Sequence, residues 1–108
     1  ASTGNTSASA GMFAANEDID CDVYIPAGQI APGKLSQAYQ FGAQIVEVDG
    51  NFDDALKQSL EDAQNHNGYT VNSVNPFRIE GQKTIPFRAL EYLNWGKNLI
   101  GLFILEVH

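Results

Sequence analysis

The spacing of apolar positions near the start of the chain predicts a helix. These positions recur at intervals of four, three and four residues, as on one face of an α-helix: Ala8, Met12, Ala15 and Ile19. Side chains that suit a helix N-cap come directly before them, so we expect the helix to be capped by Asn5 or Thr6.

The pattern then changes to a strand followed by a second helix. Residues 21–27 are rich in β-branched and aromatic side chains and close on Pro26, which predicts a strand. A helix is expected from about Gly33 to Gly42, because glycine suits the left-handed residue that ends a helix. Its buried side is expected to carry Leu35, Ala38 and Tyr39.

A second strand and a third helix follow in the same order. Residues 44–48 predict the strand, and Asp49 and Gly50 predict a turn. Asn51 is then placed to cap a helix that ends over residues 65–68. Its buried face is expected to carry Phe52, Leu56, Leu60 and Ala63.

The last part of the pattern predicts a third strand and a fourth helical stretch. The strand is expected over Tyr69–Val74 and the helical stretch over Phe77–Leu93. Pro86 removes a backbone donor inside that stretch, so we expect Thr84–Phe87 to depart from regular helix.

Helices that alternate with short strands predict an α/β fold. The simplest architecture is a three-layer αβα unit with a mainly parallel sheet of three to four strands. We assign residues 1–95 to this unit and treat residues 96–108 as a C-terminal tail, whose pattern suits an extra strand or sequence of another origin. Ligands bind such sheets beyond the carboxyl ends of the strands, where the connecting loops converge.

The composition favours a small molecule as the binding partner. The chain has 108 residues, 44% of them hydrophobic, which suits one compact domain. A net charge of −7 with six Lys and Arg argues against a nucleic acid or an anionic membrane as partner. One cysteine, Cys21, allows no internal disulfide and no cysteine metal cluster; we expect no metal site and a cytoplasmic location. No apolar stretch is long enough to span a membrane.

The opening segment, residues 1–9, has the chemistry of an anion-binding loop. Hydroxyl and amide side chains surround Gly4 directly before the first helix, whose N-terminus offers free N–H groups. A plain helix cap would have the same composition. Lys34 and Arg78 lie in later loops of the same kind, so they are expected to converge with the first loop on a phosphate. Taken separately, they also suit a solvated lysine and a surface ion-pair partner.

Four segments in order resemble the threonine synthase family. They are ASTGNTSA, IPAGQIAPGKLSQAYQFGA, VDGNFDDAL and NSVNPFRIEGQKT, and the resemblance covers residues 1 to about 95. These enzymes depend on pyridoxal phosphate and have the tryptophan-synthase β-like architecture called fold type II. The resemblance implies that the chain is the small, substrate-side domain of an enzyme that converts O-phospho-L-homoserine and water into L-threonine and phosphate.

The resemblance also implies a role for each loop residue. Asn5 is the expected contact to the ring hydroxyl of the cofactor. The substrate carboxylate is expected at Thr3, Asn5 and Thr6. The substrate phosphate is expected at Ser2, Lys34, Asn72, Ser73 and Arg78, with Thr6 shared between the two anions.

The chain departs from this family at both ends. The family's Schiff-base lysine precedes the asparagine loop and its cofactor-phosphate loop follows the fourth helix, and neither has a counterpart here. We therefore expect a piece of a longer enzyme that is inactive alone, does not hold pyridoxal phosphate by itself, and needs the missing large domain as its partner. A homo-oligomeric state of the enzyme is compatible with these residues.

Two other functions fit the same residues. A serine or threonine dehydratase of fold type II shares Asn5 but has no need for a phosphate grip. A non-catalytic α/β module could use the same loops to bind a phosphorylated metabolite.

Overall fold

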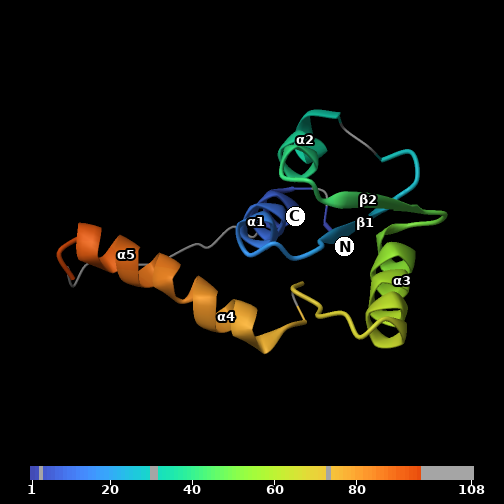
Figure 1. The fold of residues 1–108 in the computed structure, drawn as a ribbon. Helices are drawn as coiled ribbons and strands as arrows, with labels where there is room; N and C mark the ends of the chain where they lie inside the picture. The colour runs from blue at the N-terminus through green and yellow to red at the C-terminus, as the bar shows by residue number, and fades with distance from the viewer. Residues whose placement is uncertain (3, 30–31, 73, 96–108) are drawn as a thin grey trace. The chain divides into compact units, whose positions relative to one another are not determined.

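The computed structural model describes residues 1–2, 4–29, 32–72 and 74–95, which fall into two units that we treat separately. The first unit, up to Asn72, contains three helices and two strands: α1 (Asn5–Asn16), β1 (Asp22–Pro26), α2 (Pro32–Gln40), β2 (Gln44–Val48) and α3 (Phe52–Asn65) (Figure 1). The second unit contains α4 (Pro76–Gln82) and α5 (Thr84–Tyr92).

The sheet of the first unit is parallel, as predicted. β1 and β2 pair in a register that runs from Asp22 opposite Gln44 to Pro26 opposite Val48. The connection between them contains α2, which is the crossover that parallel neighbours require. The α/β class expected from the sequence is thus confirmed.

The predicted third strand over residues 69–74 is wrong for the residues that the structure describes, where the sheet has two strands. Tyr69 and Val71 are exposed to 71% and 52%, so this segment buries little of the apolar surface that would stabilise a strand. At the free edge of β1, the carbonyl of Tyr24 accepts a hydrogen bond from the N–H of Ser2 instead (3.3 Å).

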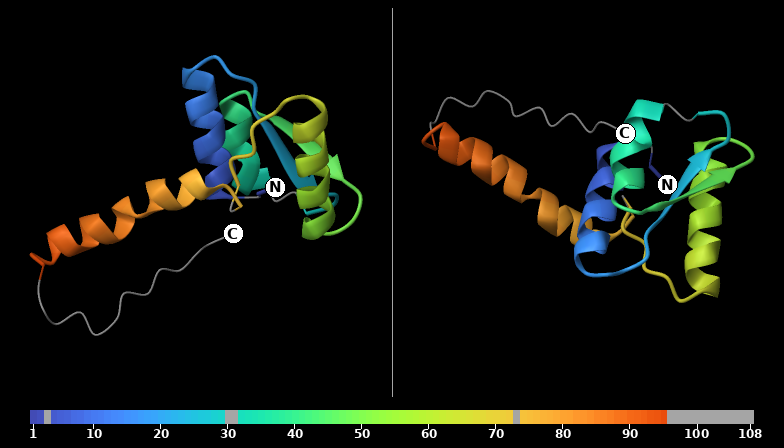
Figure 2. Two further views of the ribbon diagram at one scale, coloured as in Figure 1. Left: turned by 90° about the horizontal axis from the view of Figure 1, so that it is seen from below. Right: turned by 45° about the horizontal axis from the view of Figure 1, so that its top comes forward.

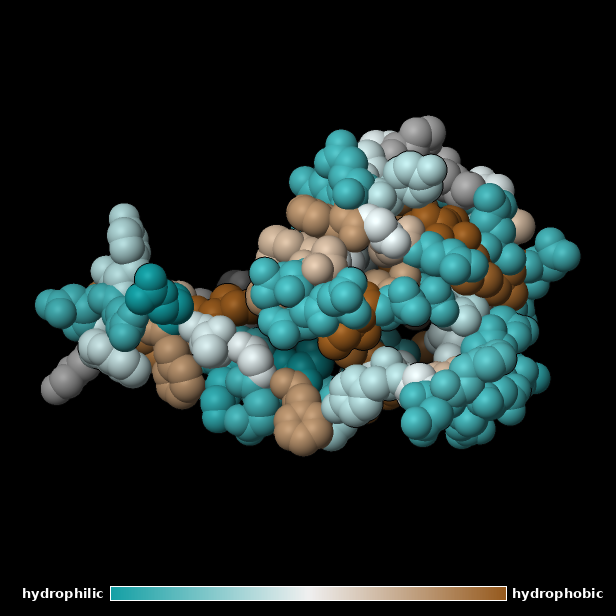
Figure 3. Space-filling model, in the orientation of Figure 1, coloured by the Kyte–Doolittle hydropathy of each residue, from teal (hydrophilic) through white to brown (hydrophobic). Residues whose placement is uncertain are grey.

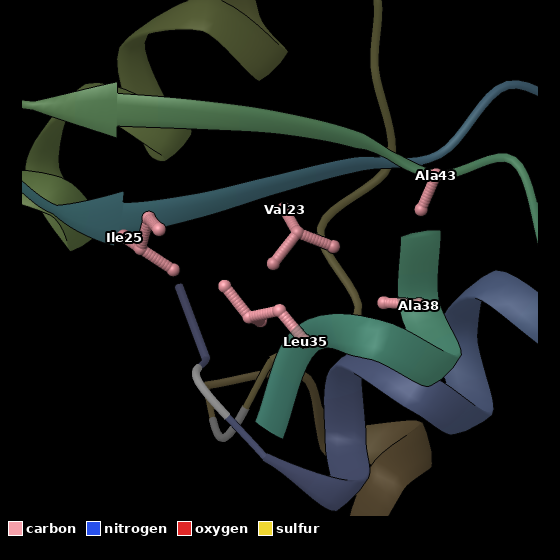
Figure 4. Close-up of a cluster of buried hydrophobic side chains, with 5 residues drawn as sticks. All are labelled: Val23, Ile25, Leu35, Ala38 and Ala43. Atoms are coloured by element: carbon pink, nitrogen blue, oxygen red, sulfur yellow. The ribbon is translucent and has the colours of Figure 1, made fainter. Parts of the chain in front are cut away.

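The two faces of the sheet are covered by different helices. Val23 and Ile25 of β1 face Leu35 and Ala38 of α2, and together with Ala43 they form the buried cluster of Figure 4. Tyr24, which alternates with them, hydrogen-bonds α3 on the opposite face. α1 packs against α2, so α1 and α2 lie on one side of the sheet and α3 on the other (Figure 2). This is the expected three-layer αβα arrangement.

The first helix buries a different face from the predicted one. Its buried residues are Ser7 and Gly11, whereas Met12 and Ile19 are 43% and 63% exposed. Gly11 has no side chain and lies against Ala38 of α2 and Ala43, so α1 can approach α2 closely, which a methionine at this position would prevent. The predicted cap is also wrong, because Gly4 occupies the N-cap position and no side chain caps the helix.

The third helix begins as predicted. The side-chain oxygen of Asn51 accepts hydrogen bonds from the N–H groups of Asp53 (2.8 Å) and Asp54 (3.1 Å), and the Asp54 carboxylate accepts one from the Asn51 N–H (2.8 Å). This reciprocal capping box fixes the entry to α3. Gly50 has a φ of 125°, and a Cβ there would lie 2.3 Å from the Asp54 carboxylate. The outer face of α3 is hydrophilic (Figure 3).

The second unit shows where the fourth helical stretch is interrupted. The break is at Lys83, between α4 and α5, and Thr84–Phe87 is helical, so the predicted position of the break is wrong. Pro86 lies in the first turn of α5, where a backbone N–H has no partner within the helix, and the helix therefore restarts before the proline. Asn75 caps α4 by accepting a hydrogen bond from the N–H of Phe77 (2.9 Å).

Two further expectations concern the ends and the membrane. The tail predicted over residues 96–108 lies outside the described residues. Within the described part of the chain, no helix has the length and apolar character needed to cross a membrane.

Candidate functional site

The first unit contains an open pocket of about 240 Å³. It is lined by the start of the chain, the first half of β1, the last turns of α3, and residues 68–72. Among the described residues, three polar side chains are buried, and all three line this pocket: Ser7 (2% exposed), Asn72 (8%) and Ser59 (9%). Buried polar groups are costly unless they serve a partner or a ligand, so the pocket is the candidate site.

Three of the predicted substrate contacts meet at this pocket. Ser2 and Thr6 come from the opening loop and the first turn of α1, and Asn72 comes from the segment after α3. Together they offer two hydroxyl groups and one amide, which are neutral hydrogen-bond donors for an anion. Residues about seventy positions apart in the sequence are thus brought to one surface.

The other predicted contacts are not part of this pocket. Asn5 is the first residue of α1, and its side chain is exposed. Lys34 lies in α2, but its side chain is outside the described part. Thr3 and Ser73 are also outside the described residues. Arg78 belongs to α4 in the second unit, where it is half-buried.

Ser2 has a fixed backbone and a defined hydroxyl environment. Its N–H donates to the carbonyl of Tyr24 (3.3 Å), and its own carbonyl accepts a hydrogen bond from the Ser7 hydroxyl (2.5 Å). The Oγ of Ser2 accepts a hydrogen bond from the N–H of Gly4 (3.3 Å). The serine is therefore held by groups from the loop, from α1 and from β1.

The pocket also carries negative charge. Asp20, Asp22 and Asp62 line it together with His66. The Asp62 carboxylate accepts hydrogen bonds from the hydroxyl of Tyr24 and from the amide of Gln58, both at 2.9 Å. These bonds occupy both carboxylate oxygens and stabilise the contact between β1 and α3. Among the described residues, no cluster of His, Cys, Asp and Glu has the arrangement of a metal site.

Sequence reasoning missed many residues of this pocket, among them four that make side-chain hydrogen bonds. Ser7, Tyr24, Ser59 and Asp62 were assigned no role, although Tyr24 and Asp62 form the hydrogen bond that joins β1 to α3. Ser7 is one of several hydroxyl and amide residues in the opening segment, so it carried no distinctive signal. Ser59, whose hydroxyl donates to the carbonyl of Leu56 (2.7 Å), is buried with Ala55 on the inner face of α3. The predicted inner face included Phe52, which is 39% exposed, so that part of the prediction is wrong.

The pKa of the Cys21 thiol is raised by burial and by the nearby charge of Asp22. The thiol therefore stays protonated at neutral pH, and thiols are weak nucleophiles in that form. Although Cys21 lines the pocket, it is suited to packing there.

The Tyr24–Asp62 hydrogen bond predicts a loss of stability at high pH. Burial, the hydrogen bond to Asp62 and the charges of Asp62 and Asp22 raise the pKa of Tyr24 to about 12 from 10.0. The folded state therefore binds the phenol proton more tightly than the unfolded state does. The protonated Tyr24 contributes about 2 kcal/mol to the free energy of unfolding. This contribution is complete below pH 10 and is lost as the pH rises towards 12.

Urea unfolding from pH 8 to pH 12 would measure this loss. Tyr24→Phe is expected to flatten the decline relative to the wild-type chain, while Tyr39→Phe, on a side chain that is 74% exposed, should leave it unchanged. Equal slopes for Tyr24→Phe and the wild type would contradict this account of the hydrogen bond.

Comparison with known proteins decides the family. Residues 1–105 match the family described as pyridoxal-phosphate dependent enzyme. The chain belongs to this family. The relatives include a threonine synthase of Methanocaldococcus jannaschii, 50% identical over 95 residues that make up 88% of this chain and 24% of the relative. A threonine synthase of Bacillus sp. is 49% identical over 102 residues, or 94% of this chain and 29% of the relative.

A third relative of this pyridoxal-phosphate-dependent enzyme family gives the same picture. The threonine synthase of Mycobacterium bovis is 54% identical over 94 residues, which cover 86% of the chain and 26% of the relative. The chain thus spans about a quarter of the length of these relatives.

The described residues do not fit covalent attachment of pyridoxal phosphate. Among the described residues that line the pocket, none is a lysine. Of the lysines whose side chains the structure describes, Lys57 is 77% exposed near Glu61, and Lys83 is 55% exposed and paired with Glu80. Such positions are hydrated, whereas an amine that reacts with a carbonyl needs a lowered pKa. The neutral donors Ser2, Thr6 and Asn72 instead suit the anionic part of a substrate, and the carboxylates lie on the same pocket.

Proposed function

We propose that this chain forms the substrate-side part of a threonine synthase. The parent enzyme would convert O-phospho-L-homoserine and water into L-threonine and phosphate, as a carbon–oxygen lyase acting on a phosphate ester. Pyridoxal phosphate would supply the electron sink for that chemistry when bound. The observation that carries the proposal is the meeting of Ser2, Thr6 and Asn72 at one pocket. The similarity to threonine synthases along most of the chain supports it.

The donor chemistry of the pocket suits the substrate phosphate. Ser2, Thr6 and Asn72 are neutral donors that hold a dianion without exchanging protons at neutral pH. The N-terminus of α1, at Gly4, has no side-chain cap, so the positive end of the helix dipole adds to the attraction. Hydrogen bonds of this kind strengthen as charge develops on the leaving phosphate, and they would therefore assist its departure as well as its binding.

The remaining contacts complete the proposed site. Lys34 and Arg78 would add the positive charges for the phosphate, and Ser73 a further hydroxyl group. Thr3 would bind the substrate carboxylate together with Thr6. Asn5, at the start of α1 with an exposed side chain, would contact the ring hydroxyl of the cofactor as well as the carboxylate.

Acting alone, the chain is not expected to catalyse the reaction. It spans about a quarter of its relatives, and no lysine is found among the described residues that line its pocket. The large domain that carries the reactive lysine and the phosphate loop of the cofactor would be its partner. The isolated chain would at best bind phosphate weakly.

A chimera provides the test of this function. The matched 95-residue segment of the M. jannaschii threonine synthase would be replaced by the corresponding part of this chain. We expect the chimera to bind pyridoxal phosphate and to release inorganic phosphate from O-phospho-L-homoserine, with threonine as the second product. Both products can be followed in the same assay.

The same chimera separates the alternatives. A folded, cofactor-bound chimera that deaminates serine or threonine and releases no phosphate would favour the dehydratase. A folded chimera that binds phosphate but has neither activity would favour the non-catalytic module. The unmodified M. jannaschii enzyme is the positive control, and cofactor absorbance reports whether each protein is assembled.

A further inference from the structure

The backbone of Ser2 is held from two sides by residues that the sequence did not single out. Its N–H donates to the carbonyl of Tyr24, and its carbonyl accepts from the hydroxyl of Ser7. Backbone groups in surface loops usually bond to water and move freely. Here two opposed hydrogen bonds restrict both peptide groups of the residue.

Both holding residues are themselves fixed. Ser7 is 2% exposed and lies on the face of α1 that is buried in the first unit. Tyr24 is 9% exposed, and its hydroxyl donates to Asp62 of α3. Because Asp62 also accepts a bond from Gln58 of the same helix, the chain of contacts runs from α3 through β1 to the loop. The position of Ser2 is thus set by packed secondary structure rather than by the loop alone.

This arrangement also favours the Ser2 hydroxyl as a hydrogen-bond donor. Its oxygen already accepts a hydrogen bond from the N–H of Gly4. A hydroxyl oxygen that accepts a bond polarises its own O–H, which makes that group a better donor. Since Ser2 lines the pocket, the donor is available to an acceptor there.

We propose that Ser7 and Tyr24 are positioning residues that fix the backbone of Ser2 so that its hydroxyl donates to a phosphate oxygen in the pocket. This inference rests on the proposed function, in which the pocket receives a phosphorylated substrate. It adds that affinity depends on two pocket residues that act through the backbone of Ser2. Ser7 acts through the carbonyl of Ser2, and Tyr24 acts through its N–H.

The test compares matched serine variants of the 108-residue chain in an NMR titration with inorganic phosphate. Ser7→Ala removes the bond to the Ser2 carbonyl, while Ser9→Ala removes an exposed hydroxyl from the same helix. We expect Ser7→Ala to weaken phosphate binding about fivefold, as one lost hydrogen bond would, and Ser9→Ala to leave it unchanged. The carbon shifts of Ser2 and the amide shift of Gly4 report the loop conformation without ligand.

A matched tyrosine pair tests the second support. Tyr24→Phe keeps the backbone carbonyl but loses the bond to Asp62, so we expect a two- to threefold weaker affinity, of about half the effect of Ser7→Ala. Tyr39→Phe is the control on an exposed side chain. The urea midpoint of each variant is measured in parallel, because a purely structural role would change stability and leave the phosphate affinity of the folded chain intact.

The outcomes distinguish this inference from the proposed function. Ser2 and Gly4 shifts that are the same in Ser7→Ala and the wild type would overturn positioning, and so would an altered loop with unchanged phosphate affinity. A wild-type chain that shows no phosphate-dependent shifts at Ser2, Thr6 and Asn72 would contradict the proposed function and with it the donor role of Ser2. Selective weakening in Ser7→Ala and Tyr24→Phe supports the inference.

Discussion

Replacing Asn72 by alanine in the active chimera is expected to lower kcat/KM for O-phospho-L-homoserine by about a hundredfold, the cost of removing one donor from a site where charge develops. Asn72 is 8% exposed and lines the pocket with Ser2 and Thr6. Water cannot readily replace its amide at a buried position. The loss should fall on kcat as well as on KM, because the phosphate gains charge as it leaves.

A second variant at the same position separates the loss of the phosphate contact from an effect of side-chain size on folding. Asn72→Asp has nearly the same size as the wild-type side chain, but it places a negative charge against the phosphate and should reduce activity further than alanine does. Asn65→Ala, on an exposed side chain in the last turn of α3, is the matched control and should retain full activity. If both Asn72 variants bind cofactor and stay within threefold of the unmodified chimera, Asn72 has no place in the phosphate site.

Replacing Ile25 by alanine is expected to cost about 3 kcal/mol in the free energy of unfolding of the chain, within the range for a fully buried isoleucine. Ile25 is 0% exposed and belongs to the cluster with Val23, Leu35, Ala38 and Ala43. Two of the other four members of this cluster are alanines, so little neighbouring side-chain volume can move into the cavity. Urea unfolding followed by circular dichroism measures the loss.

The matched control for Ile25 lies in the second unit. Ile85 of α5 is 55% exposed, and Ile85→Ala should change the free energy of unfolding by less than about 0.5 kcal/mol. A similar loss for both variants would mean that Ile25 is not packed as described. An Ile25→Val variant, which removes one methylene, should lose about 1 kcal/mol and so test whether the cost follows the volume removed.

The sequence predicted the elements of the first unit well wherever local chemistry decides them. Asn51 is followed by acidic residues, and this local signal alone specifies the capping box that the structure contains. Gly42 was expected to end the second helix, and its φ of 81° has the left-handed value that favours glycine. The second strand has the predicted bounds, residues 44–48.

Predictions that depend on distant partners were less accurate. Apolar spacing placed Met12 on the buried face of α1, but the contact with α2 selects for small side chains, and spacing carries no information on how close two helices come. The segment after α3 has the composition of a strand, yet a strand also needs a neighbour that can pair with it. Composition predicts propensity and not the partner.

The candidate site was predictable only in part for the same reason. Ser2, Thr6 and Asn72 were found from their segments and from the resemblance to a family, and they do meet at one pocket. Ser7 and Tyr24 contact the backbone of Ser2, and their side-chain types alone did not indicate this contact. Asp62 resembled any acidic residue of an amphipathic helix until its contact with β1 was known.

Gly11 limits which side chains α1 can carry at the contact with α2. A Cβ there would lie 3.5 Å from both the Ala38 carbonyl and the Ala43 Cβ, an ordinary contact that alanine could make. Any larger group would push α1 outward from α2. Ser7 lies one turn earlier on the same face, so such a shift would be transmitted along the rigid helix to Ser2. The packing of α1 on α2 therefore tolerates about one methyl group at Gly11, a residue that is not among those lining the pocket.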